Sequence, residues 1–379
     1  MKPQTIPQTH GHQSNDEALT LFRRIITNQV QPYVGSHGAQ TSPAIVVGLV
    51  TAKGEVVEAF GTREINKNLP PDGDTLFGIG SISKLFTGLI LAKVVANGDI
   101  RLSDKANKYL EPSIQIDHAI TLKQLVTHFS GLSNFPGNIA TPDNDDEDMK
   151  PNALMPAKNY SKNDLAKCLA THNCRPLNPP GKRYLYSNLG IGLLSIALQN
   201  QSGFSDFNSM NQANITQAIQ MNDTSTNITD FLEKHKRNYA QGYMARNQSL
   251  MPVPFSEMGI LAGSGELIST ANDMNKLLKS LTGLSTNALA PAVKEAECEL
   301  AEVEPGIKIS YAQEIRLASD GGKIHYKSGL TAGYSAIMLW RDNPKVGLII
   351  LANRGKFRPL LSTSNRLFEI ITRQLQAMP

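Results

Sequence analysis

The chain has 379 residues, of which 40% are hydrophobic and 18% are charged, a composition typical of a globular protein that buries a sizeable core. Its formal net charge is only +4, and no basic run is interleaved with aromatic residues, so the sequence argues against a nucleic-acid partner. No apolar run approaches the length of a membrane span, and the cysteines lack the spacing of metal ligands.

Helix signals dominate the first 300 residues. Ser14-Asn15-Asp16-Glu17 resembles a capping box, and the apolar stripe after it predicts a helix. Two apolar runs joined by Lys53-Gly54 predict a β-hairpin over 43–50 and 55–60. Residues 138–160 are acidic and rich in proline but lack the central glycine and final glutamate of a calcium loop, so we expect a solvated, mobile loop. Further helices are predicted over 81–97, 121–127, 161–171, 190–201 and 270–281.

Beyond about residue 305 the apolar period changes to two, which predicts strands. The predicted strands are 309–317, 323–327, 333–341 and 345–351, and a closing helix follows over 360–378. Strands at both ends with helices between them indicate an α/β (α+β) fold, in which an antiparallel sheet is flanked by N- and C-terminal helices and a mostly helical region is inserted.

This pattern also suggests a domain organisation. We expect a flexible N-terminus over 1–15, an α/β region over 16–80 and 300–379, and a mostly helical region over 81–299. The active site is expected in the cleft between the two regions.

The cysteines and the N-terminus bear on the cellular compartment. The sequence has three cysteines, so at least one is unpaired; we interpret Cys168, Cys174 and Cys298 as thiols, with a Cys168–Cys174 disulfide as the alternative. Residues 1–15 are polar and lack the apolar core of a signal peptide. We therefore expect a cytoplasmic protein as the sequence stands, or a periplasmic one if a leader has been removed.

A candidate nucleophile lies where a short apolar run passes through two glycines into Ser81. The predicted helix that follows is apolar on nearly every side, which indicates burial. Lys84 lies three residues later on the same face, and a desolvated lysine amine can take the proton of a serine hydroxyl. Taken alone, a Ser-x-x-Lys motif is a weak signal and is better explained as a polar first turn followed by a surface lysine.

Two further short motifs change that interpretation. Tyr186-Ser187-Asn188 precedes a predicted helix, and Lys327-Ser328-Gly329 ends a predicted strand. Singly, each has an ordinary structural explanation: a core tyrosine with a helix-capping asparagine, or a strand end followed by a turn. Ser-x-x-Lys, Tyr-x-Asn and Lys-[Ser/Thr]-Gly each occur once, in that order, and each at an element boundary. Together they indicate nucleophilic catalysis by serine.

The first two motifs supply the chemical groups for acyl transfer. Ser81 would attack an acyl carbon, while Lys84 and Tyr186 move the proton to the leaving group. Asn188 would orient Lys84 and donate to a substrate amide. We predict Ser81, Lys84 and Tyr186 as catalytic residues and Asn188 as a substrate-binding residue.

The third motif supplies binding groups. The backbone N–H groups of Ser81 and Leu330 would form an oxyanion hole. Gly329 would let a substrate lie close to the strand edge, and Lys327 and Ser328 present donors that suit a carboxylate. We therefore predict Lys327, Ser328, Gly329 and Leu330 as substrate-binding residues.

These motifs resemble those of the penicillin-recognising serine enzymes, most of all the class C β-lactamase branch. That branch includes related D-alanyl-D-alanine carboxypeptidases and β-lactamase-like carboxylesterases. The likeness spans roughly residues 40–375 and includes 98–104, 125–132 and 351–353. It implies a β-lactamase/transpeptidase-like fold and a serine hydrolase; we expect no cofactor and no metal ion.

Departures from the family pattern affect the expected substrate. Ser328 replaces the usual threonine, and Lys327 is retained where many family peptidases have histidine and many esterases have Trp-Gly-Gly. The lysine favours substrates with a free carboxylate, so we expect cleavage of β-lactam or D-Ala-D-Ala-type amide bonds. The polar N-terminus favours the alternative, a carboxylesterase on small acyl esters.

Other classes fit less well. The chain lacks the Gly-x-Ser-x-Gly elbow of an α/β-hydrolase and the His-x-x-x-His pair of many zinc hydrolases. A penicillin-binding sensor or scaffold without turnover would keep the same residues and is a third hypothesis. As partners we expect a small-molecule or peptide substrate with a carboxylate, no nucleic acid and no membrane segment, in a monomer or weak homo-oligomer.

Overall fold

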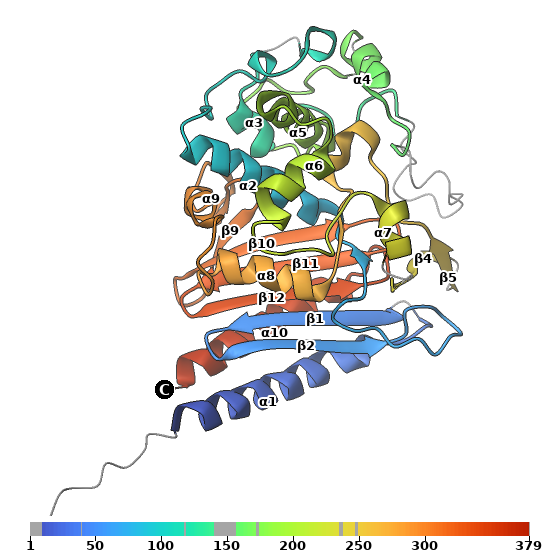
Figure 1. Cartoon of the computed structure of the whole chain (residues 1–379), viewed down its shortest axis with the longest axis vertical. Helices are drawn as coiled ribbons and strands as arrows, with labels where there is room; N and C mark the ends of the chain where they lie inside the picture. Colours follow the sequence, from blue (N-terminus) through green and yellow to red (C-terminus); the bar gives the residue numbers. More distant parts are fainter. Residues whose placement is uncertain are drawn as a thin grey trace, which may run out of the picture.

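Strands from the two ends of the chain form one sheet in the computed structural model, which describes residues 10–38, 40–116, 119–139, 157–171, 174–234, 238–246 and 249–378. Within those residues the sheet has eight strands: β1 (Ala44–Thr51), β2 (Gly54–Gly61), β7 (Ala301–Glu304), β8 (Ile307–Ile309), β9 (Glu314–Leu317), β10 (Lys323–Leu330), β11 (Ser335–Asp342) and β12 (Lys345–Ala352). Their order is β2-β1-β12-β11-β10-β9-β8-β7, and each neighbouring pair is antiparallel. The early and late segments of the chain therefore meet where β1 pairs with β12 (Figure 1).

Helices cover both faces of this sheet. On one face, α1 (His10–Val30) and α10 (Pro359–Ala377) share an apolar core with alternate residues of β1, among them Val47 (Figure 1). The intervening residues of β1, such as Val46, belong to the core on the other face, where α8 (Ala271–Leu281) packs. Because both faces are covered, β1 is buried along its whole length and has a continuous apolar sequence rather than an alternating one.

The segment between the two groups of strands is mostly helical and lies on the α8 side of the sheet (Figure 1). Its helices are α2 (Ser83–Ala96), α3 (Leu122–Val126), α4 (Lys162–Leu169), α5 (Asn188–Ser202), α6 (Phe207–Asn211), α7 (Ile228–Lys234) and α9 (Ala290–Ala296). Two short strand pairs accompany them: β3 (Phe77–Gly78) with β6 (Ile268–Ser269), and β4 (Gly242–Arg246) with β5 (Ser249–Val253). α2 is apolar around most of its circumference and is accordingly buried. Among the described helices, none is both long enough and apolar enough to cross a bilayer.

The predicted fold class is confirmed, but several local predictions are corrected. The first helix begins at His10, so Ser14 lies inside it and does not begin it. The strand predicted over 309–317 is two strands, β8 and β9, because the chain turns between them. In that turn the Ser310 N–H donates to the Gln313 carbonyl over 2.9 Å, and Ala312 has a left-handed φ of 61°. The short strands β4, β5 and β7 were not predicted, and residues 140–156 of the predicted mobile loop lie outside the described residues.

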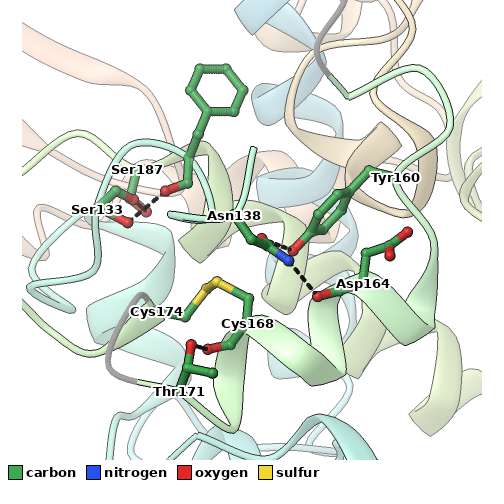
Figure 2. The surroundings of a disulfide bond; sticks show 9 residues. Ser133, Asn138, Tyr160, Asp164, Cys168, Thr171, Cys174 and Ser187 are labelled. Carbon is green, nitrogen blue, oxygen red and sulfur yellow. Dashed lines mark hydrogen bonds between the residues drawn. A yellow bond between two sulfur atoms is a disulfide. The ribbon is translucent and has the colours of Figure 1, made fainter. Parts of the chain in front are cut away.

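The cysteine prediction is also corrected. Cys168, near the end of α4, forms a disulfide with Cys174 (Figure 2). Cys298 is a free, exposed thiol. The two Cα atoms are 5.4 Å apart, within the usual range for a disulfide. A spacing of six residues can close in this way only if the chain turns back after the helix, which the sequence pattern did not reveal. The bridge anchors the start of the segment that leads to Tyr186.

The polar contacts beside the disulfide join α4 to the preceding loop. Asn138 accepts a hydrogen bond from the Tyr160 hydroxyl over 2.8 Å and donates to the Asp164 carbonyl over 2.9 Å (Figure 2). Ser161 caps α4 and forms a capping box with Asp164. These contacts hold α4, and with it Cys168, against Asn138 and Tyr160.

Candidate active site

Ser81 lies in a 3₁₀ turn, Gly80–Ile82, between β3 and the first residue of α2. The turn departs from the expected α-helical start because Gly80 has a left-handed φ of 50°. The Ser83 hydroxyl stabilises the turn, since it donates to the Gly80 carbonyl over 2.7 Å and accepts from the Leu267 N–H over 3.0 Å. Ser81 is partly exposed, whereas Gly80 and Ile82 on either side of it are buried. The turn thus presents one hydroxyl outward from a fixed backbone.

Lys84 is fully buried and directs its ammonium at three oxygen atoms. Nζ donates to Ser81 Oγ over 3.0 Å, to Asn188 Oδ1 over 2.6 Å and to the backbone carbonyl of Ser264. Burial, and secondarily the positive charge of Lys327, holds the pKa of Lys84 well below its ordinary value. The lowered pKa makes Lys84 easier to deprotonate, and its neutral amine is the form that can accept a proton from Ser81.

Asn188 is free to contact Lys84 because another residue caps its helix. The Ser187 hydroxyl accepts from the Gly190 N–H over 2.8 Å at the start of α5, and it donates to the Ser133 carbonyl over 2.7 Å. Asn188 Nδ2 donates to Asn134 Oδ1 over 2.7 Å, which fixes Oδ1 as the atom that faces Lys84. Asn188 is therefore not the helix cap that its sequence position also allowed.

Tyr186 completes the contacts of the Ser81 hydroxyl. Its phenol oxygen donates to Ser81 Oγ over 2.6 Å. Nζ of Lys84 and Nζ of Lys327 lie 4.8 Å and 5.9 Å from the centroid of its ring. Burial raises the pKa of Tyr186 above its ordinary value, so the phenol holds its proton. Ser81 Oγ thus lies between a buried amine and a half-buried phenol.

Lys327 is 7% exposed, but its environment differs from that of Lys84. Within the described residues, Nζ of Lys327 has neither a hydrogen-bond acceptor nor a salt-bridge partner; its contact is the Tyr186 ring. Burial lowers the pKa of Lys327 to about 8, and the charge of Glu314 on β9 acts in the opposite direction. The side chain is mostly buried while Nζ itself keeps some exposure to solvent, and a cation placed in this way without a protein acceptor is suited to an anionic ligand.

The end of β10 lies directly against the Ser81 turn. A Cβ on Gly329 would lie 1.9 Å from the Ile79 carbonyl oxygen and 3.0 Å from the Ser81 nitrogen, so only glycine fits there. A Cβ on Gly80 would lie 2.9 Å from the Leu330 nitrogen. This close approach brings the backbone nitrogens of Ser81 and Leu330 into one region.

The direction of the Leu330 N–H follows from the strand pairing. The next residue, Thr331, donates its N–H to the Tyr334 carbonyl over 2.9 Å in the β10–β11 connection. Backbone groups alternate in direction along a strand, so the Leu330 N–H points away from β11. Within the described residues, β10 pairs with β9 only over 323–326, so no described strand borders this edge at residues 327–330. Ser328 is half-buried on that edge.

All eight residues predicted for the site therefore lie around one point, at the junction of α2, α5 and β10. Sequence reasoning missed the Ser264 carbonyl, Asn134 and His128, which also contact these residues. Gly263-Ser264-Gly265 signalled a turn, but a backbone acceptor has no side-chain signature. Gly263 is needed there because a Cβ would lie 2.5 Å from the Cβ of Ser195 on α5.

Known proteins are similar to this chain in sequence and in fold. The family described as Beta-lactamase matches residues 22–367. The chain is 31% identical over 364 residues to "Beta-lactamase" of Escherichia coli (strain K12), which covers 84% of this chain and 86% of that protein. It is 26% identical over 263 residues to "D-alanyl-D-alanine-carboxypeptidase/endopeptidase AmpH" of the same strain, covering 68% of this chain and 62% of AmpH. The match thus spans less than two thirds of the length of AmpH.

Two solved structures show the same fold. The D-alanine carboxypeptidase AmpC from Burkholderia cenocepacia superposes with a TM-score of 0.74 at 21% identity, covering 92% of this chain and 99% of that one. The class C beta lactamase from Rhodobacter sphaeroides gives a TM-score of 0.73 at 20% identity, covering 94% and 99%. Both likenesses extend over the sheet and the helical segment together.

Proposed function

The chain belongs to the beta-lactamase family, as its motifs predicted, and from this premise we propose that it forms an acyl-enzyme on Ser81. We propose further that it cleaves β-lactam or D-Ala-D-Ala-type amide bonds. One observation carries the proposal: Ser81 Oγ is within hydrogen-bond distance of both Lys84 Nζ (3.0 Å) and Tyr186 Oη (2.6 Å), and both partners are desolvated. That is the arrangement that an activated serine nucleophile requires.

The two partners differ in how readily they accept a proton. The lowered pKa of Lys84 supports its role as the base, whereas the raised pKa of Tyr186 argues against a phenolate in the resting site. As Oγ of Ser81 bonds to the substrate carbonyl carbon, its proton passes to the Lys84 amine. When the C–N bond breaks, Tyr186 gives its proton to the leaving nitrogen and recovers one from Lys84. Water then releases the acyl group through the same donors and acceptors.

The developing oxyanion would be held by the N–H groups of Ser81 and Leu330. The backbone at Gly80 and the backbone at Gly329 lie close to each other, which supports this role. Both nitrogens are thereby near the nucleophile without an intervening side chain. Donors of this kind act strongly because the backbone is already oriented; loss of one such donor typically lowers kcat by roughly 100- to 1000-fold.

The preference for a carboxylate rests on Lys327. Its side chain is mostly buried and its ammonium has no acceptor in the described part of the chain, and a substrate carboxylate would supply one. The Ser328 hydroxyl, next along the free edge of β10, would donate to the same group. Penicillins and peptides that end in D-Ala-D-Ala both carry a carboxylate on the leaving-group side of the scissile amide.

The alternative is a carboxylesterase on small acyl esters. Leu330, whose N–H is the proposed oxyanion donor, has a side chain that is 57% exposed. A large apolar side chain at this place would suit an uncharged acyl or alcohol group. The proton transfers would be the same for an ester with an alkoxide leaving group as for an amide, so this alternative changes the substrate and leaves the mechanism intact.

Parallel rates on nitrocefin, a D-Ala-D-Ala peptide and a p-nitrophenyl ester test the proposal. We expect turnover of one of the two carboxylate substrates to exceed that of the ester in kcat/KM. Ser81→Ala should abolish all three activities, and Ser362→Ala, on the distant and exposed surface of α10, should change none. Efficient turnover of the ester alone would select the carboxylesterase, and stoichiometric acylation without turnover would select the sensor.

A further inference from the structure

A buried histidine lies against Tyr186 and has no part in the proton transfers described above. His128 is 1% exposed, and its imidazole centroid is 4.5 Å from that of the Tyr186 ring, with 34° between the planes. Its φ of 62° is left-handed, a conformation that histidine adopts more often than most residues with a Cβ. The His128 carbonyl accepts from the Leu185 N–H over 2.8 Å. Two adjacent residues of the Tyr186 segment therefore rest on His128.

A second contact reaches the peptide bond that follows Tyr186. His128 Nδ1 accepts a hydrogen bond from the Ser187 N–H over 3.2 Å. A nitrogen that accepts carries no proton, so the ring is the neutral tautomer with its hydrogen on Nε2. Burial, and then the charges of Lys327 and Lys84, keeps the pKa of His128 well below its ordinary value. An imidazolium would lose the Ser187 contact and add a third cation beside two lysines.

The peptide group between Tyr186 and Ser187 lies between two residues that contact the Ser81–Lys84 pair. Tyr186 and Asn188 both reach the Ser81–Lys84 pair, whereas the side chain of Ser187 between them caps α5. A rotation of the 186–187 peptide would move the phenol oxygen and the amide oxygen together. The Nδ1 contact of His128 holds that peptide from one side, and the Ser187 cap holds it from the other.

We propose that His128 is a positioning residue for proton transfer: its neutral imidazole fixes the Tyr186–Ser187 peptide and supports the phenol, so that Oη stays on Ser81 Oγ. The inference rests on the proposed function of Tyr186. If His128 has this role, its loss should slow one step, the delivery of a proton to the leaving group. Loss of an ordinary core residue would not affect that step selectively.

The leaving group supplies the test. An amide nitrogen must be protonated before it departs, whereas p-nitrophenolate departs without a proton. A displaced Tyr186 should therefore slow amide cleavage more than ester cleavage. A general loss of stability, or a general distortion of the site, would slow both by the same factor.

His128→Gly and His128→Asn form a matched pair, since both residues tolerate the left-handed backbone and only asparagine retains an acceptor for the Ser187 N–H. On a penicillin, we expect kcat of His128→Gly to fall roughly 10- to 100-fold, part of the 10²–10⁴-fold that acid–base catalysis supplies. KM, and kcat on p-nitrophenyl acetate, should change only a few-fold. His128→Asn should recover most of the amide activity.

A second desolvated histidine serves as the control. His325 on β10 is stacked on Trp340 with 5.2 Å between centroids and 14° between planes, and burial lowers its pKa to about 4. His325→Asn should reduce thermal stability without separating amide from ester rates. Thermal melts and the stoichiometry of labelling by a fluorophosphonate establish that each variant is folded.

The outcomes distinguish a failure of the role proposed for Tyr186 from a failure of the role proposed for His128. If Tyr186→Phe fails to slow the amide more than the ester, the role proposed for Tyr186 is wrong. If Tyr186→Phe separates the substrates but His128→Gly slows both equally, or neither, the inference about His128 is overturned. Should His128→Gly not fold, ¹⁵N-histidine NMR of the unaltered protein decides: we expect an Nε2–H neutral ring from pH 6 to 8, and a ring that titrates in that range contradicts the inference.

Discussion

Two buried lysines approach the ring of the same tyrosine from different elements, and they differ in what the protein offers them. Lys84, on α2, donates to three oxygens supplied by the chain. Lys327, on β10, has no hydrogen-bond acceptor in the described part of the protein. Because all the acceptors of the Lys84 amine belong to the chain, this lysine suits proton transfer within the site. Because the Lys327 amine has no acceptor among the described residues, this lysine suits the binding of an anionic group of a substrate.

The largest effects are expected at the internal lysine. Lys84→Ala and Tyr186→Phe should each lower kcat by roughly 10²- to 10⁴-fold, because each removes one carrier of the same proton. The double variant should lose much less than the product of the two factors, since groups that act as a unit are not additive. Losses that simply multiply would mean that only one of the two residues handles the proton, and single-turnover kinetics on one substrate would measure this.

Lys327 should instead separate substrates. Lys327→Ala removes a charge-assisted contact worth about 1.5–3 kcal/mol, so kcat/KM for a penicillin or a D-Ala-D-Ala peptide should fall roughly ten- to a hundredfold. A neutral p-nitrophenyl ester should lose only a few-fold. Lys323→Ala is the matched control, because Lys323 is on the same strand but its ammonium is paired with Glu299 at 2.8 Å on the surface.

Two other results at Lys327 would be informative. Equal losses on charged and neutral substrates would mean that Lys327 supports the Lys84–Tyr186 proton transfer and would remove the contrast between the two lysines. No loss on either substrate would make Lys327 an ordinary strand-end residue and would favour the carboxylesterase.

The pH dependence of the rate sharpens the same comparison. The pKa of Lys327 is lowered to about 8 by burial, against the opposing charge of Glu314, and only the protonated amine binds a carboxylate well. kcat/KM for a penicillin should therefore fall as the pH rises above 8, beyond any fall seen with a neutral ester, and level off at the roughly ten- to hundredfold loss expected for Lys327→Ala. Glu314→Gln removes the charge that raises this pKa, so the fall should begin at a lower pH. A shift to higher pH would contradict this assignment.

The smallest expected effect is on stability. A folded-state pKa of about 8 against an ordinary 10.5 means that the buried cation of Lys327 opposes folding by at most about 3 kcal/mol. The cost is fully present below pH 8 and disappears as the pH rises above 10.5. Allowing for lost packing, Lys327→Met should gain about 1 kcal/mol in the free energy of unfolding at pH 7 and little at pH 11, measured by urea titration.

The same substitution at Lys84 should have the opposite sign. Lys84→Met leaves Asn188 Oδ1 and the Ser264 carbonyl buried without their donor, at a cost of about 1–3 kcal/mol. Equal changes in stability at the two lysines would indicate that their environments are more alike than their contacts imply.

Much of this arrangement could be predicted from the sequence because the three motifs begin or end regular elements. Ser81 lies in the turn that precedes α2, Asn188 begins α5, and Gly329 lies near the end of β10. The end of a helix or strand restricts where a side chain can point. Because the three motifs together supply every group that acyl transfer needs, the sequence implied that they lie close together in the fold. The hairpin β1–β2 and the strand-rich C-terminal part also followed from local periodicity and turn residues.

The remainder depended on tertiary contacts that leave no local pattern. The Ser264 carbonyl is a backbone group, and the Nδ1 contact of His128 links residues 59 positions apart. The turn that separates β8 from β9 places Ala312, not glycine, at a left-handed position, so composition gave no sign of it. The Cys168–Cys174 pairing required knowing where the chain goes after α4.

The proposed nucleophile can be tested most directly by locating the covalent adduct. The protein would be incubated with a fluorescent penicillin and, separately, with a fluorophosphonate, then digested and analysed by mass spectrometry. We predict one label per chain, on Ser81, absent in Ser81→Ala and retained in Ser362→Ala. An adduct on any other residue, or labelling that survives in Ser81→Ala, would contradict the assignment of Ser81 as the nucleophile.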